Sequence, residues 1–164
     1  RNKSKSAVEH LSGEELLRLD PNGEVFPIEV VSGGIRQGVL SHNLGHPLGM
    51  QSLLQSIRHE QPVEKWICVL VTKSPETILL CFPPPRKSLS PSSSVTEVNA
   101  FWLIDSHPRP QLGITSSYAK LHPTLDSLLL SLSAIFPPTV IDDVPEIMSE
   151  MYNSFDLYPL QRRL

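Results

Sequence analysis

Residues 65–73, KWICVLVTK, form the densest run of β-branched and apolar residues in the chain. A short run of this composition, bounded by turn-forming residues, predicts a buried central strand. Ser74 and Pro75 follow directly and predict a turn into TILLCFP, residues 77–83. We therefore expect two antiparallel strands, joined as a hairpin, at the centre of a sheet.

Further strands and helices are expected on both sides of this hairpin. VNAFWLID at residues 98–105 predicts a third strand, and residues 24–34 and 35–43 predict an N-terminal hairpin that turns at Gly33-Gly34. The spacing of apolar residues predicts helices over residues 46–60 and 124–136, the second with Thr124 as its N-cap. Ser12 and Glu15 match a capping box for a short helix near the N-terminus.

The order of these elements predicts an α+β fold, with a small antiparallel sheet flanked by helices. A length of 164 residues favours a single domain over 1–164. Within it, the Pro/Ser-rich residues 83–95 are expected to form a flexible loop. Residues 108–123 should be a long connection, and residues 151–164 should form an extended tail after a helical turn at 147–152.

Composition narrows the class of protein. A net charge of −3 argues against a nucleic-acid binder, and no apolar run reaches the length of a membrane span. Cys68 and Cys81 lie within apolar runs, which favours a reduced intracellular setting, cytoplasmic or nuclear, over a disulfide framework. His42 and His46 have no evident third ligand, so we expect neither a metal nor a cofactor. The chain begins at Arg1 without Met, which indicates that residues can be missing upstream.

The third predicted strand ends in a chemically distinctive stretch, FWLIDSHPR, residues 101–109. Residues two apart on a strand point to the same face, so Asp105 and His107 should project together. A carboxylate beside an imidazole fixes the tautomer of the ring and raises its basicity. The alternative interpretation of Asp-Ser-His-Pro is a capped strand end with no chemical role.

Residues 47–136 resemble the C-terminal half of papain-like cysteine deubiquitinases, above all the viral tegument-protein class and its cellular relatives. The similar pattern is a helix, a hairpin with a strand ending at Thr72, and an aromatic strand ending in Asp105-Ser106-His107-x-Arg109. Gly113 and a leucine-rich helix follow. The resemblance implies a papain-like cysteine peptidase fold with His107 as general base and Asp105 as its orienting acid.

The nucleophile is where the chain departs from that family. The family's nucleophilic cysteine begins a helix well upstream of the Asp-His strand, after a glutamine of the oxyanion hole, and no such helix is evident here. Cys68 and Cys81 instead fall in strand interiors, where a thiol usually packs as a buried hydrophobe.

Two functions stay open from the sequence. The first is a non-catalytic interaction module that binds ubiquitin, a ubiquitin-like modifier or another subunit of an assembly. Its partner-binding residues would be Arg109 and the tail residues Tyr152, Phe155, Leu157 and Tyr158, because a tail this apolar either docks on a partner or packs back on its own domain. The alternative is an active cysteine deubiquitinase whose nucleophile lies upstream of Arg1.

Overall fold

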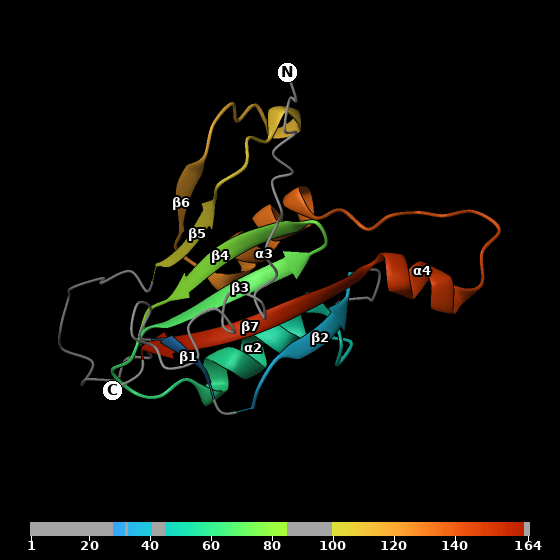
Figure 1. Ribbon diagram of the computed structural model, residues 1–164. Helices are drawn as coiled ribbons and strands as arrows, with labels where there is room; N and C mark the ends of the chain where they lie inside the picture. Colours follow the sequence, from blue (N-terminus) through green and yellow to red (C-terminus); the bar gives the residue numbers. More distant parts are fainter. Residues whose placement is uncertain (1–27, 32, 41–44, 85–99, 163–164) are drawn as a thin grey trace, which may run out of the picture.

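The computed structural model describes residues 28–31, 33–40, 45–84 and 100–162. In this part of the chain the fold is α+β, as predicted, with one antiparallel seven-stranded sheet (Figure 1). The strand order is β1-β7-β3-β4-β5-β6, and β2 also pairs with β7. The strands are β1 (Ile28–Val30), β2 (Arg36–Val39), β3 (Ile67–Lys73), β4 (Glu76–Phe82), β5 (Phe101–Asp105), β6 (Tyr118–His122) and β7 (Ser154–Arg162). The helices are α2 (Met50–Glu60), α3 (Leu125–Ile135) and α4 (Glu146–Tyr152).

The hairpin of β3 and β4 lies inside the sheet, which confirms the central strand expected from KWICVLVTK. Alternate residues of β3 face the core, so Ile67, Val69 and Val71 are fully buried. Val69 lies opposite Leu80 of β4. These side chains join one core cluster with the buried faces of α2 and α3, which include Leu54 and Leu128. Burial of this apolar surface is the main force that holds the sheet and the helices together.

The helices expected over residues 46–60 and 124–136 are present as α2 and α3, and the expected N-cap of α3 is confirmed. Thr124 accepts a hydrogen bond through its side chain from the backbone N–H of Ser127 at 3.1 Å. The Ser127 hydroxyl lies 3.4 Å from the backbone N–H of Thr124, which completes a reciprocal capping box. The cap fixes where α3 begins, directly after β6 returns the chain to the core.

The C-terminal tail is a central strand of the sheet. β7 hydrogen-bonds to β3 on one edge, with Leu70 opposite Tyr158. On its other edge it pairs with β2 over residues 154–157 and with β1 over residues 160–162. The predicted N-terminal hairpin is therefore wrong. β1 and β2 each pair with β7, because its nine residues offer a backbone edge long enough for both.

Pro159 sits inside this central strand, where a proline normally disrupts a ladder. Its carbonyl accepts a hydrogen bond from the backbone N–H of Val31 at 2.8 Å. The N–H and C=O of one strand residue point to the same edge, so the missing N–H of Pro159 is on the edge away from β3. That position lies between the segments of β7 that pair with β2 and with β1. The ladder with β3 thus loses no donor.

Besides β7, a second strand was not predicted, and some predictions fall outside the described residues. The connection expected over residues 108–123 contains a short 3-10 turn, Pro110–Leu112, and the edge strand β6. The capping box at Ser12 and most of the Pro/Ser loop at 83–95 lie among residues that the structure does not describe. Among the described residues, no helix is long and apolar enough to cross a membrane.

Candidate functional site

Asp105 is the last residue of β5, and its side chain is fully buried. The alternation along β5 places Phe101, Leu103 and Asp105 on the buried face and leaves Trp102 and Ile104 exposed. A buried carboxylate needs several hydrogen-bond donors to offset its lost hydration. The residues that supply them come from the four positions that follow in the chain and define the site.

His107 contacts Asp105 twice, once through its backbone and once through its ring. The backbone N–H donates to Asp105 Oδ1 at 2.9 Å, and ring Nδ1 lies 3.3 Å from the same oxygen. With a proton on Nδ1, the carboxylate accepts from the ring and fixes its orientation. The sequence predicted this pairing from a shared strand face, but β5 ends at Asp105, and the contact is made through a tight turn instead.

The imidazole of His107 lies at the surface. Its side chain is 36% exposed, whereas the carboxylate that orients it is completely buried. Ser106 Oγ approaches Nδ1 at 3.4 Å, at the long limit of a hydrogen bond. A partly exposed ring that is oriented by a buried acid has the form of a general base.

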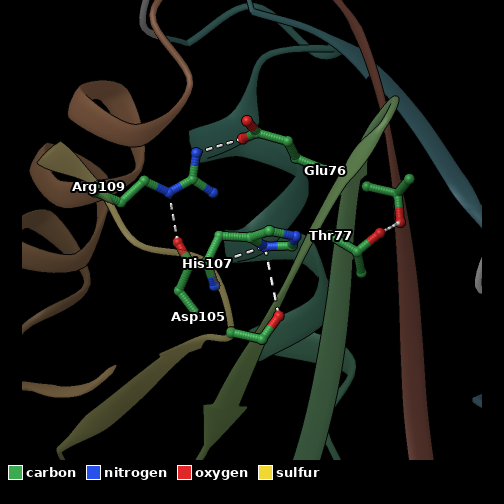
Figure 2. Close-up of polar contacts among 7 residues, drawn as sticks. Glu76, Thr77, Asp105, His107 and Arg109 are labelled. Atoms are coloured by element: carbon green, nitrogen blue, oxygen red, sulfur yellow. Dashed lines mark hydrogen bonds and ion pairs between the residues drawn. The ribbon is translucent and has the colours of Figure 1, made fainter. Parts of the chain in front are cut away.

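Arg109 anchors the acid from the other side (Figure 2). Its Nε donates to Asp105 Oδ2 at 2.7 Å, and its Nη1 donates to Glu76 at the start of β4. The guanidinium also lies 5.8 Å from the centre of the Phe136 ring. Burial alone would lower the pKa of Arg109, but its hydrogen bonds to Asp105 and Glu76 raise that pKa overall. Each oxygen of Asp105 thus has its own donor.

The role expected for Arg109 as a partner-binding residue needs correction. Its side chain is only 4% exposed, because the guanidinium turns inward to neutralise Asp105. It positions the acid in the free chain and presents almost no surface to a partner.

Sequence reasoning missed two residues of this site. Tyr118 of β6 lies directly opposite Asp105, and burial followed by the negative charge of Asp105 raises the pKa of its phenol. Glu76 is the second carboxylate on Arg109. Neither had a local signal, because β6 was not predicted and the pairing of Glu76 with Arg109 spans 33 residues.

The two cysteines lie on the opposite face of the sheet from Asp105. Cys81 is the register partner of Trp102, which is exposed on the outer face of β5. Asp105 is three positions from Trp102, an odd number, so its side chain leaves from the other face. Cys68 is directly opposite Cys81 and shares its face. Neither thiol is positioned to react with the aid of His107.

The residues of the C-terminal tail divide into a buried and an exposed group. Phe155, Leu157 and Tyr158 are buried in β7, so they pack within their own domain and are not accessible as partner anchors in this structure. Tyr152 is 57% exposed on α4. It shares that helix with three more exposed apolar side chains, Ile147, Met148 and Met151.

A cavity of about 110 Å³ lies between α2 and α3, away from the acid–base pair. Met50, Leu132 and Phe136 are among its mainly apolar lining residues, and neither Asp105 nor His107 borders it. Within the described ranges, no three His, Cys, Asp or Glu side chains are grouped so that they could hold a metal ion.

The chain matches no family model, and it matches no curated protein. The functional proposal below is therefore argued from the geometry of the described residues.

Proposed function

We propose that this chain is a protein-interaction module with the fold of a papain-like cysteine deubiquitinase, which by itself is not catalytic. It would recognise ubiquitin, a ubiquitin-like modifier or a neighbouring subunit. The observation that carries the proposal is the pairing of Asp105 with His107 at an exposed sheet end, while both cysteines of the chain lie on the other face.

The side-chain contacts that Asp105 makes favour a peptidase-like origin over a simple capped turn. A capped strand end needs only the bond from the backbone N–H of His107 to Asp105. Here the ring of His107 also contacts the carboxylate, Arg109 donates to its second oxygen, and Glu76 in turn accepts a hydrogen bond from Arg109. Orientation of an imidazole by a buried carboxylate is the recurring arrangement of nucleophilic hydrolases.

The exposed apolar face of α4 supports the recognition of a partner. Ile147, Met148, Met151 and Tyr152 recur at the spacing of one helical face and are between 43% and 70% exposed. Asp142, Asp143, Glu146 and Glu150 add negative charge in and just before the helix. A partner with an apolar patch bordered by lysine and arginine would complement this surface. Figure 1 shows α4 beyond the end of β7, clear of the helices that cover the sheet.

Titration of isotope-labelled ubiquitin, or of a labelled ubiquitin-like modifier, with this chain tests the proposal by NMR. We expect shifts confined to an apolar, basic patch of one modifier. The substitution Met151→Glu should weaken binding about tenfold or more, because it places a charge in the centre of the contact. Leu130→Glu is the matched control, since Leu130 is 74% exposed on α3 and its change should leave binding unaltered. Absence of shifts with every modifier, or equal binding by the Met151→Glu variant, would refute recognition through α4.

The intact acid–base pair favours a second function, an active cysteine isopeptidase whose nucleophile is upstream of Arg1. In that enzyme a thiolate would attack the isopeptide carbonyl, and His107 would give a proton to the departing lysine amine. The test is reaction of the longer gene product with ubiquitin that carries a C-terminal electrophile. Capture that survives Cys68→Ser and Cys81→Ser but is lost in His107→Ala would establish the enzyme and overturn the non-catalytic proposal. Lack of capture together with retained modifier binding would support the module.

A further inference from the structure

The outer face of the sheet holds a pair of thiols that the site around His107 does not use. Cys68 of β3 and Cys81 of β4 are directly opposite in the register, and their Sγ atoms are 3.6 Å apart. Both cysteines are free, and each is partly accessible to solvent. Two thiols in contact across neighbouring strands form a dithiol that is already close to the geometry of a disulfide.

The backbone at this position suits a covalent link. Directly opposed residues of antiparallel strands have Cα atoms about 4.5–5.5 Å apart, within the range of about 4.4–6.8 Å that disulfides span. The strands are held in this register on both sides of the pair, by Ile67 opposite Phe82 and by Val69 opposite Leu80. Only a small movement of the two side chains separates the thiols from a bond.

The residues that lie directly beside Cys68 and Cys81 on the neighbouring strands are apolar. Leu160 of β7 lies opposite Cys68, and Trp102 of β5 lies opposite Cys81. Neither neighbour titrates, so each thiol is the main polar group acting on the other. A hydrogen bond from the Cys81 thiol lowers the pKa of Cys68 to about 7, although burial acts in the opposite direction. The same interaction raises the pKa of Cys81, so the two thiols together lose a first proton more readily than a lone thiol would.

We propose that Cys68 and Cys81 form a redox modification site, which hydrogen peroxide converts to a reversible disulfide between β3 and β4. The Cys68 thiolate attacks one peroxide oxygen and breaks the O–O bond, so the product is a sulfenic acid, and the other oxygen leaves as water after taking a proton. The Cys81 sulfur then attacks the Cys68 sulfur and expels the second oxygen as water. Two thiols are oxidised to one disulfide, and one peroxide is reduced to two waters.

This modification is independent of the function proposed above. Asp105, the acid that orients His107, faces the other side of the sheet from the two thiols, so the acid–base pair is not needed for their reaction. A disulfide here would fix together the two central strands, whose partner strands β7 and β5 lie on either side.

Treatment of the reduced full chain with hydrogen peroxide, followed by intact and peptide mass spectrometry, tests the proposal. We expect loss of two hydrogens, a peptide in which Cys68 is linked to Cys81, and full recovery with dithiothreitol. In Cys81→Ser the reaction should stop at a sulfenic acid on Cys68, which dimedone traps. Successive gain of oxygen by the wild-type chain without an internal link, or linkage between chains only, would overturn the proposal.

A second pair of variants tests the role of the hydrogen bond. The substitution Cys81→Ser keeps a hydrogen-bond donor for the Cys68 thiolate, whereas Cys81→Ala removes the donor. Without the donor the pKa of Cys68 should return toward its ordinary value, which lowers the thiolate fraction at neutral pH but leaves a more nucleophilic thiolate. Alkylation of Cys68 at pH 7 should therefore be about fivefold to tenfold slower in Cys81→Ala than in Cys81→Ser. Equal rates in the two variants would refute activation of Cys68 by its neighbour.

Discussion

Arg109→Ala is the substitution that most directly probes the buried ion network of the site. Asp105 is fully buried, and Arg109 is the cation that neutralises it. Removal of one partner of a buried ion pair leaves a charge without compensation, at a cost of about 3–5 kcal/mol. Because each kcal/mol shifts the Tm of a domain of this size by about 2–4 °C, we expect Tm to fall by about 6–20 °C. Chemical denaturation and calorimetry measure both quantities.

Two further variants separate the charge effect from other consequences of the substitution. Glu76 is 40% exposed, so Glu76→Gln should cost less than about 1 kcal/mol. The double variant Asp105→Asn/Arg109→Ala should be more stable than Arg109→Ala alone, because no buried charge is left unpaired. The backbone bonds between Arg109 and Ile114 do not involve the side chain of Arg109, so we expect them to be the same in every variant. An Arg109→Ala cost no greater than that of Glu76→Gln would refute the reasoning.

Three further predictions concern the scaffold. Gly38→Ala should destabilise the chain by about 1–3 kcal/mol in urea unfolding, because a Cβ there would lie 2.3 Å from the Phe155 ring. Asn153→Asp should lower the free energy of unfolding at neutral pH by about 2–3 kcal/mol, since a carboxylate cannot donate to the Thr139 carbonyl as the amide does. Burial, and then the nearby charge of Lys120, lowers the pKa of His122. The unfolded chain therefore binds that proton first, and stability should decrease as the pH falls below about 6.5.

Each of these predictions has a direct control. Gln37→Ala, at the exposed position before Gly38, should change stability by less than about 0.5 kcal/mol. In Asn153→Asp the side chain still accepts from the backbone N–H of Thr139, so a variant as stable as the wild type would contradict a role for the lost donor. A His122→Gln variant should have a flatter stability profile between about pH 5 and pH 7. A profile identical to that of the wild type would mean that His122 does not titrate differently in the two states.

The sequence predicts those parts of the fold whose signal is local. The alternating buried residues of β3 and β4 and the Thr124 cap of α3 are each encoded within a few neighbouring positions, so the hairpin and the helix could be predicted. The partners of β1 and β2 could not, because their pairing with β7 joins residues more than 100 positions apart. Pro159 is also unusual in a central strand, and no local pattern indicates which edge its missing N–H faces.

The candidate site also combines contacts between residues close in sequence, which could be predicted, with contacts between distant residues, which could not. Asp105 and His107 are close in sequence, so their contact was predicted, although it arises from a turn and not from a shared strand face. The inward turn of Arg109 was not predicted, because it depends on Glu76 and Phe136, which lie far away in the chain. For Phe155 and Leu157 the apolar composition fits a docked tail and a central strand equally well, and only the register with β2 decides between them.

The place of β7 in the sheet has a consequence for the synthesis of the protein. Residues 154–162 are translated after every other strand described here, yet β1, β2 and β3 all hydrogen-bond to them. While the ribosome still holds this segment, β1 and β2 have no ladder to join and β3 has one bare edge. The nascent chain therefore exposes unpaired strands until residues 154–162 have left the ribosome, and until then chaperone binding would protect those strands from aggregation.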